Sequence, residues 1–384
     1  HAEREQQRAA APPPPPVTRC WSNAGPPHPG TPSRNASGAW GQGSEYASGS
    51  PPPMPHQRSA SNQSTFPAQV HLRGDPLDPN ENPGGQRRAL VVGCNYPGRP
   101  SALRASVTDA QQWARFFTKM CGMSEMDIRF LCDEPAQYQQ RPRPDRAVST
   151  RENVLRGLHW LTSRSAPGDQ IFFVFCGHGA QVVVEEFAGR TLCECACATT
   201  DVFEGGDQPR VVSDTDVHKA LLAVPSGAQV TLLYDACHAG RPLDRSGLDF
   251  LSDYVDRGHV DYEKLRGHPV RPRFLQLPHW KPRPVPPEAV RESLLRCQAT
   301  HWAACSNAHF CVELPVDVDD RPRGVFTWML INALLKVGVQ SSSARLLQEA
   351  RELNAQKKGT WRLQQETQLT VCQATSESQP FLRG

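Results

Sequence analysis

The chain of 384 residues carries 42 basic and 39 acidic side chains, and its net charge of +3 is too balanced to indicate binding to nucleic acid or to a membrane surface. No apolar run approaches the roughly 18 residues of a transmembrane helix, and the 13 cysteines are spread through a long chain, which favours reduced thiols in the cytoplasm over a disulfide scaffold. The 36 prolines and a mean hydropathy of −0.53 indicate that part of the chain builds no apolar core.

Residues 1–86 are rich in Pro, Ser, Gly, Gln and Asn and include the run Pro12–Pro16. Such a segment cannot bury enough apolar surface to offset its conformational entropy, so we predict a disordered prodomain. Its proline runs favour the polyproline II conformation, which proline-recognising modules bind, so such modules are candidate partners of this segment.

Hydrophobic patterns from residue 87 onward predict an α/β domain with a mostly parallel central sheet flanked by helices. Residues 133–148 are interpreted as a polar insertion, and Asp214 as the cap of a further helix. The expected strands are 88–93, 127–132, 171–176, 230–235, 299–304 and 368–372. Two of the expected helices begin after the caps Thr108 and Thr150, and two others span 325–335 and 344–353.

Two of these strands end in small residues with one reactive side chain each. The first is followed by Gly177-His178-Gly179, and the second ends in Asp235-Ala-Cys237. Because the carboxyl ends of parallel strands meet at one edge of a sheet, we expect the imidazole and the thiol to lie together. Such a pair activates a cysteine nucleophile, and the backbone N–H groups of Gly179 and Cys237 are the expected oxyanion donors.

The same residues carry a resemblance, because Gly177-His178-Gly179 followed by Asp235-Ala-Cys237-His resembles the caspase-like cysteine peptidases, and the metacaspases in particular. This resemblance implies a caspase-like fold and an endopeptidase that cleaves proteins or peptides after Arg or Lys. It also implies that Asp109 and Asp235 form the floor of the pocket for the basic residue. From its position alone, Asp109 has a simpler interpretation, in which it only complements the dipole of its helix.

The resemblance runs from about residue 87 to the C-terminus. It divides one peptidase domain, 87–384, into a large-subunit-like part at 87–243, a linker at 244–296 and a small-subunit-like part at 297–384. The basic, proline-rich linker is interpreted as lying on the surface.

The resemblance further implies a calcium ion as a possible activator and no organic cofactor. The matching ligands are Asp214, Asp216, Asp244 and Glu194. Thr215 replaces one acid of the family's pattern, and because calcium favours six to eight oxygen ligands, we expect a weak site.

Two other functions stay open at this point. A catalytically silent caspase-like scaffold would act through its proline-rich arm. A zinc module would use Cys193, Cys195 and Cys197, although alternate positions on a strand place all three thiols on one face, where packing is the simpler explanation.

Self-processing follows from a preference for basic residues, since a protease of this kind can cut its own chain only in extended segments. The junction before the core offers Arg73, Arg87 and Arg88. In the linker, proline follows Arg271, Lys281 and Arg283 and disfavours a cut there. Among the remaining linker residues, which include Arg273, we predict Arg257, Lys264 and Arg266 as the better sites.

Overall fold

The computed structural model describes residues 85–133, 146–187, 190–237, 243, 248–250, 271–275, 277, 294–305, 311–314, 322–361, 365–372 and 375–383. Nearly all of the predicted prodomain, the predicted self-cleavage residues Arg257, Lys264 and Arg266, and the predicted ligand Asp244 lie outside these ranges.

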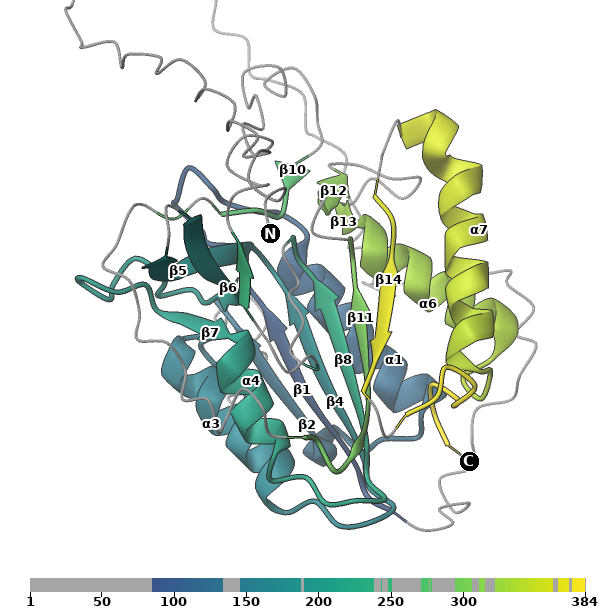
Figure 1. The fold of residues 1–384 in the computed structure, drawn as a ribbon. Coiled ribbons are helices and arrows are strands. Elements are labelled where there is room, and N and C mark those ends of the chain that lie inside the picture. The colour runs from purple at the N-terminus through teal and green to yellow at the C-terminus, as the bar shows by residue number, and fades with distance from the viewer. Residues whose placement is uncertain are drawn as a thin grey trace, which may run out of the picture. The chain divides into compact units, whose positions relative to one another are not determined.

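The centre of the described part is a 7-stranded sheet in the order β14-β11-β8-β4-β1-β2-β3 (Figure 1). Every neighbouring pair in it is parallel except β11 and β14, so the predicted mostly parallel sheet is confirmed. Its strands are β1 (Arg87–Gly93), β2 (Ile128–Cys132), β3 (Arg146–Ala147), β4 (Gln170–Cys176), β8 (Gln229–Asp235), β11 (Gln298–Ala303) and β14 (Gln368–Val371).

Helices cover both faces of this sheet (Figure 1). Alternate residues of each strand point to opposite faces, so Leu90 and Phe173 join one apolar cluster with α3 and α4, while Ala89 and Phe172 join another with α1, α6 and α7. Within the described residues, no helix is both long and apolar enough to cross a membrane. The helices are α1 (Ser106–Met120), the short 3₁₀ turn η1 (Glu125–Asp127), α3 (Arg151–Ser163), α4 (Asp214–Leu221), α6 (Val325–Val337) and α7 (Ser343–Trp361).

Two smaller antiparallel sheets lie beyond the carboxyl edge of the central sheet (Figure 1). One contains β5 (Gly179–Phe187), β6 (Arg190–Ala198), β7 (Val211–Ser213) and β9 (Leu248–Phe250), and the other contains β10 (Arg271–Pro272), β12 (Val312–Leu314) and β13 (Arg323–Gly324). Cys193, Cys195 and Cys197 alternate along β6 and all three are buried, so packing accounts for their spacing.

Helix α1 begins two residues earlier than the predicted cap Thr108. Residues distant in sequence replace the cap, because Asn95 Oδ1 accepts a hydrogen bond from Val107 N at 3.2 Å and Glu313 accepts from the backbone just before the helix. The contact with Asn95 satisfies one of the N–H groups that every helix start leaves unpaired, and Glu313 fixes the chain that leads into the helix. Sequence periodicity contains no information about such tertiary partners.

The cap of α4 is Ser213 and not the predicted Asp214. Ser213 and Asp216 form a capping box in which each side chain accepts from the other residue's backbone N–H. The predicted cap of α3 is confirmed, since Thr150 accepts from Asn153 N. The segment predicted as an insertion also contributes β3, which pairs with β2.

Candidate active site

The fold brings His178 and Cys237 to the same edge of the central sheet. Strands β4 and β8 pair in parallel as far as Cys176 and Asp235, and each reactive residue follows two positions later. Gly179 then packs against the nucleophile loop so tightly that a Cβ built on it would lie 1.3 Å from the Cys237 carbonyl oxygen. Only glycine leaves room for this approach.

His178 is held as a neutral base. Its Nε2 lies 2.6 Å from the carbonyl oxygen of Ser101, and because a carbonyl only accepts hydrogen bonds, Nε2 carries the proton and donates it. Burial lowers the pKa of His178 to about 4. The buried Nδ1 makes no hydrogen bond of standard geometry within the described ranges, although the backbone of Arg273 is close enough to act on the ring, so its lone pair is available to accept a proton.

The sulfur of Cys237 is surrounded by two other cysteines. Its Sγ accepts a hydrogen bond from Cys311 N at 3.1 Å and lies 3.2 Å from Cys311 O. A thiol–thiol hydrogen bond joins Cys305 to Cys237, and together with burial it raises the pKa of Cys305 well above its usual value. Cys305 therefore stays a neutral thiol. Both neighbours come from segments after the linker, and no local motif in the sequence marks them.

The two backbone N–H groups predicted as oxyanion donors converge on one carbonyl oxygen. Gly179 N donates to Arg273 O at 2.9 Å, and Cys237 N donates to the same oxygen at 3.1 Å. Donors at this distance from a single oxygen are the arrangement that stabilises a developing oxyanion.

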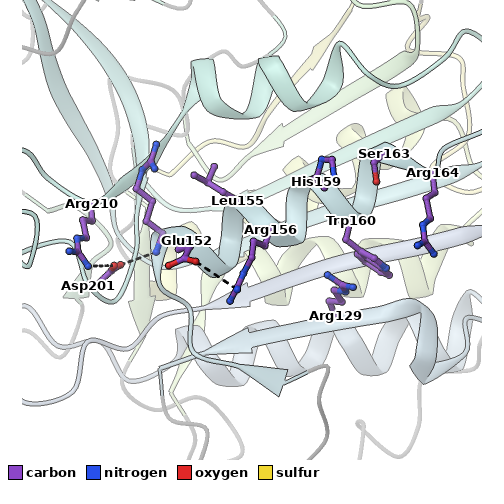
Figure 2. A pocket seen from close by; sticks show the side chains of 11 residues that line it. Arg129, Glu152, Leu155, Arg156, His159, Trp160, Ser163, Arg164, Asp201 and Arg210 are labelled. Carbon is purple, nitrogen blue, oxygen red and sulfur yellow. Dashed lines mark hydrogen bonds and ion pairs between the residues drawn. The ribbon is translucent and has the colours of Figure 1, made fainter.

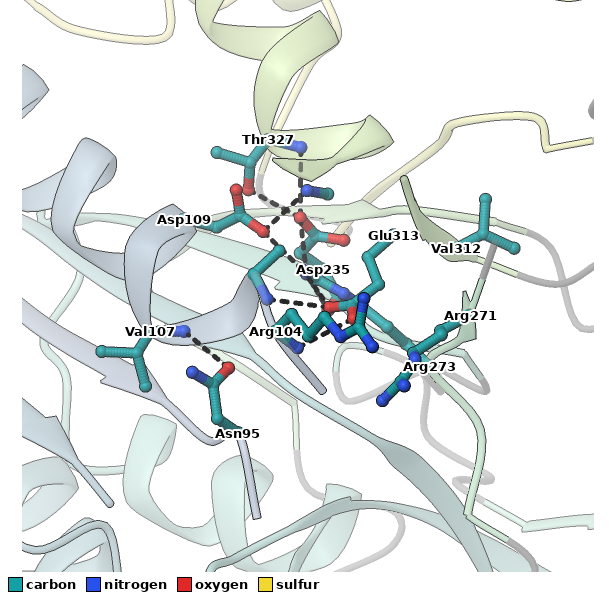
Figure 3. Close-up of polar contacts among 12 residues, drawn as sticks. Asn95, Arg104, Val107, Asp109, Asp235, Arg271, Arg273, Val312, Glu313 and Thr327 are labelled. Carbon is teal, nitrogen blue, oxygen red and sulfur yellow. Dashed lines mark hydrogen bonds and ion pairs between the residues drawn. The ribbon is translucent and has the colours of Figure 1, made fainter. Parts of the chain in front are cut away.

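The side chain of Arg273 is completely buried among carboxylates (Figure 3). Its Nη1 lies 2.9 Å from Asp235 Oδ2, its Nη2 pairs with Asp109 Oδ2, and Glu313 Oε2 is 3.8 Å from Nη2. The two aspartates predicted for the basic-residue pocket therefore lie together around a guanidinium. Glu313, which no motif in the sequence marks, adds a third carboxylate, and the charge of Arg271 as well as that of Arg273 acts on it.

Backbone and hydroxyl donors hold the acids in place. Glu313 accepts from the backbone of the loop before α1 at 2.8 and 3.0 Å. Asp235 Oδ2 accepts from Thr327 Oγ1 at 2.6 Å, and Asp109 Oδ2 accepts from Gly324 N at 2.9 Å. These donors fix the positions of the carboxylates, although the buried Asp109 Oδ1 has no hydrogen-bond partner among the described residues.

Burial shifts the pKa values of the pocket. It raises the pKa of Asp109, an effect that the Arg273 guanidinium opposes and that the charge of Asp235 reinforces. Burial also raises the pKa of Glu313, again opposed by Arg273. For Arg273, burial acts to lower the pKa, but Asp235 and Asp109 outweigh it and raise the pKa well above the usual value. Arg273 is therefore held in the charged state, whereas burial outweighs the guanidinium at Asp109 and leaves its pKa at about 7.

The backbone around Arg273 lies in the cleft as an extended strand. Strand β10 pairs antiparallel with β12, Arg273 N donates to Cys311 O at 2.8 Å, and Leu275 N donates to Gly179 O at 2.9 Å. This part of the linker 244–296 is buried, so the prediction that the linker lies on the surface is wrong here. The physical reason is that the arginine finds carboxylates for its side chain and partners for its backbone on both sides.

Three of the four predicted calcium ligands, Glu194, Asp214 and Asp216, lie within the described residues, and Asp244 lies outside them. Glu194 accepts a hydrogen bond at 2.5 Å from a backbone N–H in the first turn of α4, where Asp214 also lies. The carboxylate of Asp216 is engaged by the helix cap and by Arg151 at 3.0 Å, so it does not fit as a calcium ligand. Within the described residues, no three His, Cys, Asp or Glu side chains are arranged to hold a metal ion.

A hollow of about 970 Å³ runs along α3, and none of the active-site residues lines it (Figure 2). Its lining holds five arginines and two carboxylates, and each carboxylate pairs with an arginine, Asp201 with Arg210 at 3.3 Å and Glu152 with Arg156 at 3.7 Å. Because it lies apart from His178 and Cys237, we assign it no part in the chemistry. It is lined by Arg129, Arg151, Glu152, Leu155, Arg156, His159, Trp160, Ser163, Arg164, Asp201 and Arg210.

Comparison with known families identifies the part of the chain that holds the site. The family model described as metacaspase, peptidase C14 domain, matches residues 87–246. Residues 87–246 are therefore similar to the metacaspase domain. The family resemblance carried by the motifs, to the metacaspases among the caspase-like cysteine peptidases, is confirmed. The matched segment includes Asp109, His178, Asp235 and Cys237 but ends before Arg273.

Curated proteins similar to this segment include metacaspases of two fungi. Metacaspase-1 of Candida glabrata is 31% identical over 160 residues, which are 42% of this chain and 38% of the relative. Metacaspase-1 of Cryptococcus neoformans is 31% identical over 161 residues, which are 42% of this chain and 33% of the relative. The matched segment thus spans between a third and two fifths of the length of these relatives.

Two solved structures are more distant. A protein from Geobacter sulfurreducens has a TM-score of 0.47 and 14% identity, and the match covers 75% of this chain and 93% of that one. Caspase-1 from Spodoptera frugiperda has a TM-score of 0.35 and 10% identity, with 78% and 93% covered. At these scores the two structures support no inference about the candidate site.

Proposed function

We propose that this metacaspase is a cysteine endopeptidase that cleaves after arginine or lysine and processes its own chain. One observation carries the proposal. Arg273 has its carbonyl oxygen on the N–H groups of Gly179 and Cys237 while its side chain pairs with Asp109 and Asp235. An arginine in this position is oriented as the residue on the acyl side of a bond to be cut.

The reaction uses the two side chains at the sheet edge. His178 Nδ1 takes the thiol proton of Cys237, and the sulfur attacks the carbonyl carbon of the basic residue. The backbone donors hold the oxyanion while the C–N bond breaks and His178 returns the proton to the leaving amine. Water then hydrolyses the thioester and restores the thiol. The Ser101 carbonyl keeps the ring oriented throughout by accepting from Nε2.

The pocket suits a cation because it is buried and carries an excess of carboxylates. The two terminal nitrogens of a guanidinium contact Asp109 and Asp235 separately. The ammonium of lysine has one nitrogen, which would have to contact both carboxylates. Charge-assisted hydrogen bonds of this kind gain strength when water is excluded. An acidic residue would meet three carboxylates, and the pocket rejects it.

For self-processing, we infer that the bond between Arg273 and Phe274 is cut, in place of the bonds after Arg257, Lys264 or Arg266. The residue after Arg273 is not proline, so the leaving amine is an ordinary peptide nitrogen. The strand also already holds the hydrogen bonds that an extended substrate needs on both sides of the bond.

The test compares the full chain with its Cys237→Ala variant after incubation at neutral pH. We expect a new N-terminus at Phe274 in the wild type and an intact chain in the variant. Arg273→Ala removes this cut, while the matched change Arg266→Ala leaves it. Fragments that begin after Arg257, Lys264 or Arg266, with none at Phe274, would contradict the assignment.

We further propose that calcium stimulates the enzyme through a site near the start of α4. Glu194 and Asp214 support this proposal by their position, and Asp244 is the third candidate ligand. Isothermal titration of calcium into the Cys237→Ala chain tests binding separately from activity. Equal, small heats for this chain and for an additional Asp214→Ala variant would refute the site.

The alternative of a catalytically silent scaffold predicts that the wild-type chain cleaves no peptide, so that substitution of Cys237 or His178 changes no measured activity. It finds little support in a site where the histidine is neutral and two N–H groups are aimed at one oxygen. Extended protein or peptide segments with Arg or Lys are the proposed substrates. Binding of proline-recognising modules to residues 1–86 stays a separate prediction.

A further inference from the structure

The chain continues through the cleft beyond the carbonyl that would be attacked. Gly179, the first residue of β5, uses both of its backbone groups there: its N–H donates to Arg273 O, and its carbonyl accepts from Leu275 N at 2.9 Å. This pairing forms a short parallel bridge opposite Phe274. The two residues after the bond are therefore aligned by backbone hydrogen bonds, like an added strand.

The side chains of this segment alternate between the two apolar clusters of the domain. Phe274 packs against the cluster that contains Cys237, α1 and α6. Leu275 is only 6% exposed and belongs to the opposite cluster, which contains α3 and α4, and Leu277 packs against that same cluster from its edge. The period of two is that of an extended strand inserted between two apolar surfaces.

We propose that the active site selects an apolar side chain at the second position after the cut, in the place that Leu275 occupies, with an aromatic or other apolar residue before it. The proposal rests on the proposed function and adds a second determinant to it. The residue before the cut is recognised by charge, whereas the residues after it are recognised by burial. The substrate class is then an extended segment with a basic residue followed by an apolar pair.

Leu275 is the stronger determinant because it is nearly as buried as a core leucine, whereas Phe274 and Leu277 are only partly buried. Leucine has about three more buried carbon atoms than alanine, and their burial is lost when the position is changed to alanine. We therefore expect the rate constant for cleavage to fall roughly tenfold or more. A charged side chain in that place loses more, since burial of an unpaired carboxylate is unfavourable.

The experiment uses internally quenched peptides with the sequence of residues 268–279, cleaved by the full-length wild-type chain. In the parent peptide the position of Leu275 is changed to Ala or Asp, and the matched control changes the position of Leu277 to Ala. Mass spectrometry verifies the cut after the arginine. Strand 271–275 of the enzyme must leave the cleft before a peptide can bind, a requirement that is the same for every peptide and cancels in the ratios.

We expect Leu275→Ala in the peptide to lower kcat/KM about tenfold or more, Leu275→Asp to lower it further, and Leu277→Ala to change it less than threefold. Equal values for all four peptides would overturn the inference, and so would equal losses at positions 275 and 277, which would indicate a general effect of hydrophobicity. The proposed function is tested separately by a peptide with Arg273→Ala. If that peptide is cut as fast as the parent, the specificity for basic residues is wrong.

Discussion

Gly324 offers a clean test of the basic-residue pocket, because its Cα faces the centre of the carboxylate cluster. A Cβ built on it would lie 2.5 Å from Asp235 Oδ2, 2.6 Å from Asp109 Oδ2 and 2.8 Å from Arg273 Nη2. Its backbone has a φ of −73°, which alanine adopts without strain. The Gly324→Ala change therefore adds one methyl group to the pocket and leaves the start of α6 intact.

The expected loss follows from the contacts that the methyl group displaces. All three atoms are closer than any Cβ contact tolerates, so at least one carboxylate–guanidinium contact must open. A hydrogen bond to a charged group contributes about 1.5–3 kcal/mol, which corresponds to a loss of about 10- to 150-fold in kcat/KM for arginine substrates. Peptides with a small uncharged residue at this position should be affected less, because they do not need that space.

The assay compares kcat/KM for peptides with arginine and with alanine before the cut, together with the rate at which iodoacetamide alkylates Cys237. We expect Gly324→Ala to lose arginine selectivity and keep the alkylation rate. Gly98→Ala is the matched control, since no atom lies within 4 Å of the added Cβ, although its φ of 75° strains the backbone. Unchanged arginine selectivity in Gly324→Ala would refute the location of the pocket.

Three further predictions follow from the site and the core. The pKa of His178 should be about 4 when titrated by NMR in the Cys237→Ala chain. Because the unfolded chain binds this proton near pH 6.5, the contribution of His178 to stability falls as the pH drops from about 6.5 to 4. A titration midpoint near 6.5 would contradict a buried neutral ring. Thr327→Val removes the hydroxyl that donates to the pocket and should lower kcat/KM for arginine peptides about tenfold, with recovery in Thr327→Ser. Asp169→Ala leaves the buried Arg88 without its partner at 2.8 Å and should cost about 3–5 kcal/mol in urea unfolding, while a loss below about 1 kcal/mol would show that Arg88 finds water.

The sequence patterns alone predicted six of the seven strands of the central sheet and placed His178 and Cys237 at one edge of it, whereas Asp109 and Asp235 were predicted only through the family resemblance. Long apolar runs that end in glycine or in a reactive side chain indicate buried parallel strands, and parallel strands of equal length end at one edge. His178 and Cys237 are placed by that geometry, which is repeated in every fold of this class. A helix cap can also be predicted from the sequence when its partner lies three residues away, as for Thr150 and the backbone N–H of Asn153.

Only the tertiary structure decided which linker residue enters the cleft and what surrounds it. The sequence distinguished the seven basic residues of the linker only by whether a proline follows them. The position of Arg273 depends on its contact with Asp109, which is 164 positions away in the chain. Glu313, Cys305 and Cys311 reach the site in the same way, from strands and loops beyond the linker. A contact between distant segments depends on packing that no local pattern encodes, so a buried arginine among carboxylates becomes visible only when the chain is folded.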